Sequence, residues 1–315
     1  MTITVPRPLV RSWAPGRPVN VAATWGTLRR GAGDPTWKSS GGVLWRGVLT
    51  PLGAVTLRVS TRHSEARVVG HAWGAADAAT WLLDRLPSML GEDDDPSGFV
   101  AHHPPVAAAL EHRGAGWRVP RTGLVLESLV PAIIEQKVTG QEAFAGYRRL
   151  VRRLGQTAPG PGAELGLSVP PAPEQLRRVA SWEWLRMGVS PQRADTVMRV
   201  VRVADRLADV VDLPLAQAHR RLRAVPGVGV WTAAETAQRA LGDADAVSFG
   251  DYHVAKNIGW ALTGEEVDDD GLAELLEPYR GHRYRVQRLL ELAGMMRPRR
   301  GPRMAPRRHL PTQRL

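Results

Sequence analysis

Apolar and polar residues alternate along the first third of the chain. Residues 42–60 alternate with a period of two on either side of a Pro-Leu-Gly turn at 51–53, which predicts two antiparallel strands joined by a short loop. Residues 67–73 are typical of a third strand. Residues 77–90 instead repeat apolar side chains at helical spacing, and Asp77 is the expected N-cap. The pattern therefore predicts a small antiparallel sheet with one helix.

Beyond residue 120, apolar positions recur at spacings of three and four, which predicts helices almost to the end of the chain. Thr139 and Glu142 are spaced as a capping box at the start of one helix. Ser190 as cap and Pro191 as first helical residue mark the start of another. The predicted helices are 122–138, 139–154, 174–187, 190–208, 214 to the turn at 225, 230–241, 252–262 and 271–296, with a Pro/Gly-rich connection at 158–173.

These elements predict an α+β fold in three parts. Residues 1–96 form an N-terminal antiparallel β-sheet layer with a helix, residues 97–296 form an all-helical core, and residues 297–315 are a disordered tail rich in Arg and Pro. The acidic run at 92–96 between the first two parts is predicted to be an exposed, solvated linker and not a metal site.

Some histidines and tryptophans receive structural interpretations. The His-His-Pro-Pro stretch at 102–105 is expected to be a loop and not a metal site. Most of the 11 tryptophans are expected in the core, including Trp182 and Trp184.

The most informative stretch starts at Val225 and reads VPGVGVWTAAETAQRALGDADAVSFGD as far as Asp251. Pro226 fixes one φ angle, whereas Gly227 and Gly229 accept positive φ and let the backbone approach a ligand closely. The helix that follows points free N–H groups and its positive dipole end toward the same place, which suits a phosphate. The alternative is a tight turn between two packed helices.

Composition and charge favour a polyanionic partner. The 315 residues include 42 basic and 31 acidic side chains, a net charge of +11, with 43% hydrophobic and 23% charged residues. Seven arginines of the tail account for most of the excess, since 35 basic residues remain against 31 acidic ones without them. A solvated basic tail is therefore an alternative explanation of the charge. These arginines are Arg297, Arg299, Arg300, Arg303, Arg307, Arg308 and Arg314.

Other features exclude whole classes of protein. The chain has no cysteine, which rules out disulfides, zinc-thiolate sites and iron-sulfur clusters. No apolar run approaches the eighteen or so residues that span a bilayer, and the N-terminus lacks a signal-peptide core, so no membrane association is expected.

The stretch from Val225 to Asp251, with Leu222 before it and 249–252 around its end, resembles the helix-hairpin-helix DNA glycosylase superfamily. The resemblance is closest to the branch of bacterial 3-methyladenine DNA glycosylase II. Residues 117–120, 133–136 and 182–209 match further segments of that branch, so about two thirds of the chain is covered well and the N-terminal third loosely.

The resemblance makes Asp251 the candidate catalytic residue. Breaking an N-glycosidic bond passes through an oxocarbenium-like sugar, which a carboxylate stabilises while it orients or deprotonates the attacking water. Asp251 is also placed to cap the helix that follows it, and both roles are open. Lyase-type relatives carry a lysine where this chain has Trp231, so hydrolysis without strand cleavage is expected.

The resemblance also assigns binding residues. Trp231 and Tyr252 match aromatic positions that stack on cationic bases, while Glu235 and Glu291 stand where relatives have other aromatics and leave the substrate range open. Lys137 replaces a leucine that fills the gap left by the flipped base. The residues expected to contact DNA are Pro226, Gly227, Val228, Gly229, Val230, Thr232, Gln136 and Lys137.

No cofactor is required by this resemblance. It implies an optional structural Na⁺ or K⁺ ion at the hairpin, held by the backbone carbonyls of Arg223, Val225 and Val228, and no iron-sulfur cluster.

The sequence thus predicts a monomeric, monofunctional DNA glycosylase that removes damaged bases, alkylated purines above all, from double-stranded DNA in base excision repair. It is expected in the cytoplasm, associated with the nucleoid. One alternative is a helix-hairpin-helix protein that binds damaged or abasic DNA without chemistry. Another is a helical scaffold whose basic tail binds RNA or other partners.

Overall fold

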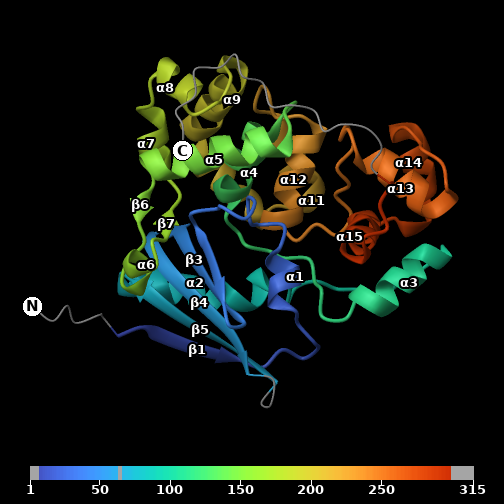
Figure 1. The fold of residues 1–315 in the computed structure, drawn as a ribbon, viewed down its shortest axis with the longest axis horizontal. Helices are drawn as coiled ribbons and strands as arrows, with labels where there is room; N and C mark the ends of the chain where they lie inside the picture. The colour runs from blue at the N-terminus through green and yellow to red at the C-terminus, as the bar shows by residue number, and fades with distance from the viewer. Residues whose placement is uncertain (1–6, 63–65, 299–315) are drawn as a thin grey trace, which may run out of the picture.

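The computed structural model describes residues 7–62 and 66–298. The predicted tail from residue 299 onward lies outside the described residues. The molecule has a β-sheet on one side and a larger helical body on the other (Figure 1). Among the described residues, no helix is both long enough and apolar enough to cross a bilayer.

A five-stranded antiparallel sheet forms the N-terminal layer, with strand order β1-β5-β4-β3-β2. The predicted hairpin is confirmed, because β3 and β4 pair from Leu44 opposite Val59 to Thr50 opposite Gly53. The alternation buries Val55 and Leu57 on one face. The strands are β1 (Leu9–Trp13), β2 (Trp37–Ser40), β3 (Val43–Thr50), β4 (Gly53–Arg62) and β5 (Arg67–Gly74).

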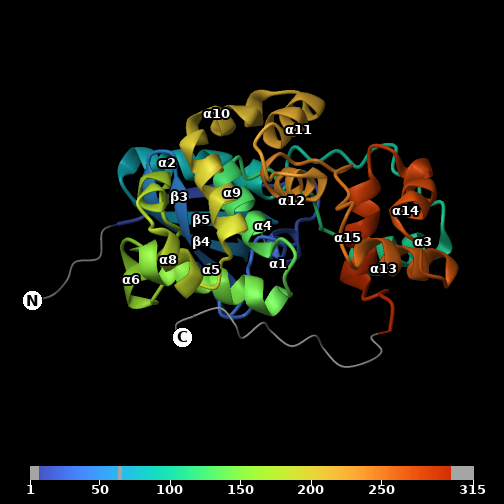
Figure 2. The same ribbon diagram turned by 90° about the horizontal axis from the view of Figure 1, so that it is seen from above.

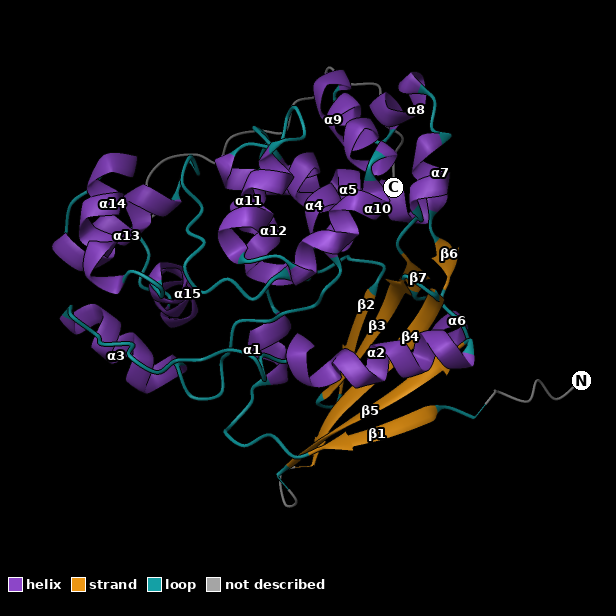
Figure 3. Ribbon diagram, turned by 180° about the vertical axis from the view of Figure 1, so that it is seen from behind, coloured by secondary structure: helices purple, strands orange, loops and turns teal. Residues whose placement is uncertain are grey.

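Helix α2 (Ala76–Met89) packs across the sheet (Figure 3). It buries Leu82, Leu83 and Leu86 at its helical spacing. The prediction of Asp77 as N-cap is wrong, because Ala75 takes that place without a side-chain hydrogen bond. The Asp77 carboxylate lies in the first turn and accepts from the next backbone N–H, where its charge still favours the positive end of the helix dipole.

The acidic run at 92–96 is not fully solvated as predicted. Asp94 is only 8% exposed and pairs with Arg285 at 2.6 Å. It also accepts a hydrogen bond from the Val119 N–H at 3.1 Å. A buried carboxylate requires a charged partner, which Arg285 supplies from the last described helix. The segment therefore anchors the sheet layer to that helix.

The helical body has two groups of helices. The first surrounds α4, which contacts α5, α9 and α12 and is buried on nearly every side. Its run of Leu129, Val130, Ile133 and Ile134 explains this, since a helix that is apolar all round is stable only inside a core. The helices are α4 (Val125–Glu135), α5 (Gly140–Leu154), α7 (Pro173–Arg177), α8 (Ser181–Arg186), α9 (Pro191–Arg202), α10 (Ala204–Ala208), α11 (Leu215–Arg223) and α12 (Val230–Ala240).

The second group lies at the far end of the molecule from α8 (Figure 2). It consists of α3 (Pro104–Arg113), α13 (Val254–Thr263), α14 (Asp269–Leu276) and α15 (Arg283–Ala293). The loop predicted at 102–105 is partly helix, because Pro104 and Pro105 are the first residues of α3, where the missing N–H of proline costs nothing.

Three predicted helices are in fact divided. The helix predicted at 174–187 breaks into α7 and α8 because the Glu183 side chain accepts from the Ala180 N–H and starts a new helix. The one predicted at 190–208 ends at Arg202 and resumes as α10. The one predicted at 271–296 is interrupted by a short 3₁₀ turn and by Gly281, whose φ of +90° is left-handed.

The capping box at Thr139 is confirmed, with the Glu142 carboxylate accepting from the Thr139 N–H at 3.0 Å. Trp184 is buried as predicted, at 1% exposure. Trp182 is not a core residue, since it is 51% exposed and lies under the guanidinium of Arg186.

Two further contacts join the sheet to the helical body. Arg30 pairs with Glu135 at the end of α4 at 3.1 Å, and Arg46 of β3 pairs with Glu127 of the same helix. A small hairpin covers the sheet near Trp45; it consists of β6 (Gln156–Thr157), α6 (Pro161–Glu164) and β7 (Ser168–Val169).

The division at residue 96 stays a prediction. Short helix α1 (Val21–Trp25) leads to Thr27, which reaches the site below.

Candidate active site

The predicted hairpin connects α11 to α12. Its turn is closed by the Val228 N–H, which donates to the Val225 carbonyl at 3.0 Å, and Gly227 has a φ of +97°. The first helical bond of α12 runs from the Ala233 N–H to the Gly229 carbonyl. The N–H groups of the three residues between them therefore have no partner in the helix and face outward from its positive end. The exposed glycines and this helix start can receive an anion.

Gln136, at the C-terminal end of α4, braces the hairpin. Its side-chain amide donates to the Gly227 carbonyl at 3.0 Å and to the Thr232 hydroxyl at 2.8 Å. The neighbouring Lys137 is exposed and has a φ of +54°, so it projects from a tight turn beside the hairpin. The structure thus brings the two predicted DNA-contacting segments together, and the contacts with DNA stay predictions.

Close packing explains why the hairpin requires glycine at position 227. A Cβ added there would lie 2.3 Å from the Thr196 hydroxyl of α9. A Cβ at Gly229 would meet no atom within 4 Å. The first glycine is therefore required by the fold, and the second keeps the outer surface of the hairpin open to a ligand.

The three carbonyls expected to hold a monovalent ion belong to Arg223, Val225 and Val228. Val225 and Val228 are buried beneath the turn. The Val225 carbonyl accepts one hydrogen bond and keeps a second lone pair. The donor set fits a Na⁺ or K⁺ ion, whose presence stays a prediction.

Of the two roles that the sequence left open for Asp251, the structure shows the capping of the following helix, and the catalytic role stays a prediction. One carboxylate oxygen accepts from the His253 and Val254 N–H groups at 2.7 and 3.1 Å and thereby caps α13. The other oxygen accepts from the Trp231 indole nitrogen at 3.1 Å. These partners are all neutral donors, and no side chain among residues 7–62 and 66–298 forms an ion pair with the carboxylate.

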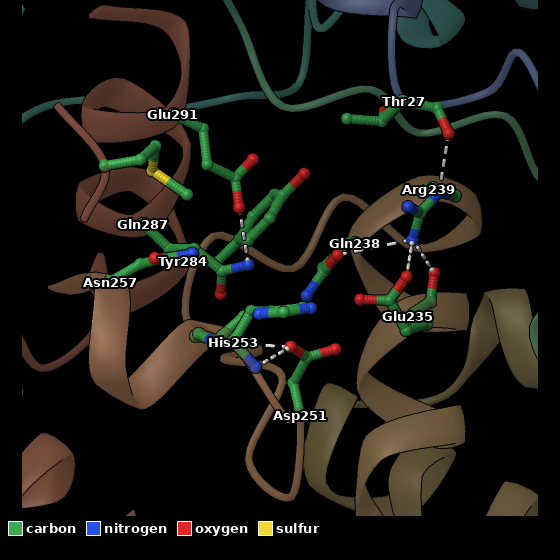
Figure 4. Close-up of a pocket in the computed structure, with 12 residues that line it drawn as sticks. Thr27, Glu235, Gln238, Arg239, Asp251, His253, Asn257, Tyr284, Gln287 and Glu291 are labelled. Atoms are coloured by element: carbon green, nitrogen blue, oxygen red, sulfur yellow. Dashed lines mark hydrogen bonds and ion pairs between the residues drawn. The ribbon is translucent and has the colours of Figure 1, made fainter. Parts of the chain in front are cut away.

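A cavity of about 240 Å³ lies beside Asp251, bordered by α12, α13, α15 and the segment after α1 (Figure 4). Glu235 and Glu291 both line it, which brings the two unexplained carboxylates to one place. The full lining is Thr27, Glu235, Gln238, Arg239, Asp251, His253, Val254, Asn257, Tyr284, Gln287, Glu291 and Met296.

The two aromatic residues predicted for the base pocket do not line this cavity. Trp231 holds Asp251 from the hairpin side. Tyr252 is 72% exposed, and the ammonium of Lys256 lies 4.4 Å from its ring centre. The turn at 250–253 places Asp251 in the lining and leaves its neighbour Tyr252 exposed, and the stacking of Trp231 and Tyr252 on a base stays a prediction.

Arginines balance both cavity glutamates. Glu235 pairs with Arg239 at 2.9 Å, and Arg239 also donates to the Thr27 carbonyl at 2.9 Å. Glu291 pairs with Arg288 at 2.8 Å. Asp251 therefore supplies the unbalanced charge of the lining, and a cation that enters the cavity is attracted to it.

Burial shifts two groups near the cavity. It raises the pKa of Tyr284 to about 12, so the hydroxyl stays protonated at neutral pH. That hydroxyl is buried and has no hydrogen-bond partner among the described residues. Burial also raises the pKa of Glu135, an effect that its pairing with Arg30 opposes.

Helical spacing contains the signal for lining residues that the sequence interpretation missed. Gln238 and Arg239 lie three and four positions after Glu235 on α12, and Gln287 lies four before Glu291 on α15. The contribution of Thr27 has no such signal, because a hydrogen bond across more than two hundred residues places it there.

The sheet layer, the hairpin between α11 and α12, and the aspartate that follows define a helix-hairpin-helix DNA glycosylase fold. The structure of a 3-methyladenine DNA glycosylase from Archaeoglobus fulgidus superposes with a TM-score of 0.73 at 17% identity, covering 90% of this chain and 98% of that one. An 8-oxoguanine glycosylase/lyase from Clostridium acetobutylicum, bound to DNA, superposes with a TM-score of 0.67 at 13% identity, covering 91% and 98%. The resemblance is confirmed at the level of the fold.

In sequence, the chain is similar to a Mycobacterium tuberculosis protein described as a probable bifunctional transcriptional activator/DNA repair enzyme AlkA. The two are 29% identical over 182 residues, which cover 56% of this chain and 36% of that protein. The match thus spans about a third of the relative's length. No model of a known protein family matches the chain.

Proposed function

We propose that this protein is a monofunctional DNA glycosylase that hydrolyses the N-glycosidic bond of alkylated purines in double-stranded DNA and acts as a monomer in base excision repair. The observation that carries the proposal is Asp251, a carboxylate that lines a cavity, has no ion-pair partner among the described residues and is hydrogen-bonded to Trp231 just after the hairpin.

The arrangement supports separate roles for the hairpin and for Asp251. The hairpin N–H groups hold a phosphate of the DNA backbone, while the nucleotide beside it is extruded into the cavity. Asp251 stabilises the positive charge that develops on the sugar and orients the attacking water. A cationic alkylated purine leaves as a neutral base, so this step needs no proton donor.

Trp231 supports hydrolysis without strand cleavage. A lyase forms a Schiff base through an amine near the sugar. Here the corresponding side chain is an indole whose N–H is bound to Asp251. The ammonium of Lys256 is not placed as such an amine, because it lies against the exposed Tyr252 ring, 4.4 Å from the ring centre.

Duplex DNA methylated with a simple alkylating agent tests the proposal. The expected result is release of methylated purines, intact strands until alkali is added, and no protein trapped on DNA by borohydride. Borohydride trapping would refute the monofunctional assignment. Binding of the duplex without release of any base would instead favour a protein that recognises damaged DNA without chemistry.

A further inference from the structure

The His253 side chain enters the cavity from the start of α13 (Figure 4). Its backbone N–H is bound to the Asp251 carboxylate at 2.7 Å, which fixes the segment while the ring remains exposed. The ring packs edge-on against Tyr252, with 4.9 Å between the ring centres. Neither imidazole nitrogen has a hydrogen-bond partner among residues 7–62 and 66–298, so both are available to a ligand.

Two glutamine side chains of the cavity are already engaged. The Gln238 amide donates to the Ala246 carbonyl at 2.7 Å, and Gln287 donates to Glu291 at 3.0 Å. Turning these groups toward a ligand would leave buried partners unsatisfied, which is costly. These two glutamines are therefore held in place, whereas the imidazole nitrogens of His253 are free to contact a ligand.

We propose that His253 is a general acid that protonates uncharged bases as they leave, so that the enzyme also releases neutral damaged purines. This inference rests on the proposed glycosylase function. It extends the substrate class beyond bases that already carry a positive charge.

The two kinds of base differ in their need for a proton. When the bond between C1′ and the base nitrogen breaks, its electron pair goes to the base. A cationic purine then leaves as a neutral molecule, but an uncharged purine would leave as an anion unless it is protonated. The His253 imidazolium donates that proton to a ring nitrogen of the base. Water adds to C1′ and gives its own proton to Asp251 or to solvent, and the imidazole regains a proton from solvent.

The position of His253 suits this division of roles. Asp251 and His253 are two residues apart and reach the same cavity from one segment. We assign the carboxylate to the sugar and the imidazole, which lines the same cavity, to the base. One group thus stabilises a developing cation while the other neutralises a developing anion.

Single-turnover release of two bases tests the proposal. Duplexes that contain either hypoxanthine, a neutral base, or 7-methylguanine, a cationic one, are given to wild type and to His253→Gln. We expect the variant to release hypoxanthine about 100-fold more slowly, within the range typical of general acid catalysis. Release of 7-methylguanine should fall by much less than release of hypoxanthine, because that base leaves without a proton.

Two outcomes would overturn the proposal. An equal loss of rate on both bases, with weaker binding of the duplex, would mean that His253 contacts the DNA backbone. Release of 7-methylguanine by wild type without any release of hypoxanthine would mean that no general acid operates. Failure of wild type to release any base from either duplex would refute the glycosylase function itself, a result distinct from both.

Discussion

The indole N–H of Trp231 donates to the Asp251 carboxylate at 3.1 Å, across twenty residues of sequence. The bond ties the first turn of α12 to the loop before α13. Since the other oxygen of Asp251 caps α13, both carboxylate oxygens are held by hydrogen bonds. The hairpin and the candidate catalytic group are therefore one rigid unit.

Replacing Trp231 with Phe tests this hydrogen bond, because a smaller aromatic ring is kept and the N–H is lost. A hydrogen bond to a charged group contributes about 1.5–3 kcal/mol, so we expect kcat for base release to fall about 10- to 100-fold with KM within about twofold. Kinetics on an alkylated duplex provide the measurement. If Trp231 acts only by stacking on the base, the Phe variant will retain nearly full kcat.

The hairpin glycines offer a matched pair of variants. Gly227→Ala places a Cβ 2.3 Å from the Thr196 hydroxyl at a φ of +97°, so we expect a loss of at least about 2 kcal/mol in the free energy of unfolding. Gly229→Ala has open space and should cost at most about 1 kcal/mol. Urea unfolding compares the two. Equal stability of the variants would show that the turn does not have this geometry.

Asp94 and Asp93 test whether the acidic segment anchors the fold. Asp94→Ala removes one partner of a buried pair with Arg285 and should lower the free energy of unfolding by about 3–5 kcal/mol. Asp93 forms an exposed pair with Arg121 at 3.8 Å, so Asp93→Ala should cost less than about 1 kcal/mol. Thermal or urea unfolding of both variants checks this. A solvated linker would make the two losses equal and small.

Asp245 should make stability depend on pH. Burial alone would raise its pKa, but hydrogen bonds from Arg283 and from the Gly281 N–H outweigh it, and the pKa is lowered. A lowered folded-state pKa contributes stability above the unfolded value near 3.9, and this contribution is lost as the pH falls through the folded value. Asp245→Asn should therefore cost about 2 kcal/mol at pH 7 and progressively less below about pH 4.

Urea unfolding of wild type and Asp245→Asn at several pH values measures this difference. A difference in stability that stays constant from pH 7 to pH 3 would contradict the assignment. The result also bears on the site, because Asp245 ties the loop that leads to Asp251 to the start of α15.

Local patterns predicted the parts of the fold that depend on local physics. The alternation at 42–60 identified β3 and β4, and the spacing of Thr139 and Glu142 identified the start of α5. Strands β1 and β2 were not predicted, because both are short edge strands with little alternation of apolar and polar residues. Their pairing is decided by the neighbouring strand. Helix lengths were overestimated where one residue, such as Glu183 or Gly281, starts or stops a helix.

In the candidate site, too, local features could be predicted from the sequence and contacts between distant segments could not. The hairpin, the helix α12 that follows it and Asp251 lie in one continuous stretch of sequence. All three could therefore be predicted, including that the N-terminus of α12 points toward the hairpin. Contacts between distant segments could not, such as the bonds from Gln136 to the hairpin and from Arg239 to Thr27. The solvent exposure of Tyr252 could not be predicted either, since nothing in the sequence around it shows which way the turn directs its ring.

Single-turnover release of base from an alkylated duplex by wild type and by Asp251→Asn tests the central claim most directly. Asparagine keeps the shape and one carbonyl oxygen to cap α13, so the variant should fold and bind DNA. The account predicts that wild type releases the base and leaves an abasic site, while the variant is slower by at least about 100-fold, as expected when charge stabilisation of the transition state is lost. Equal rates of release by the two proteins would contradict it.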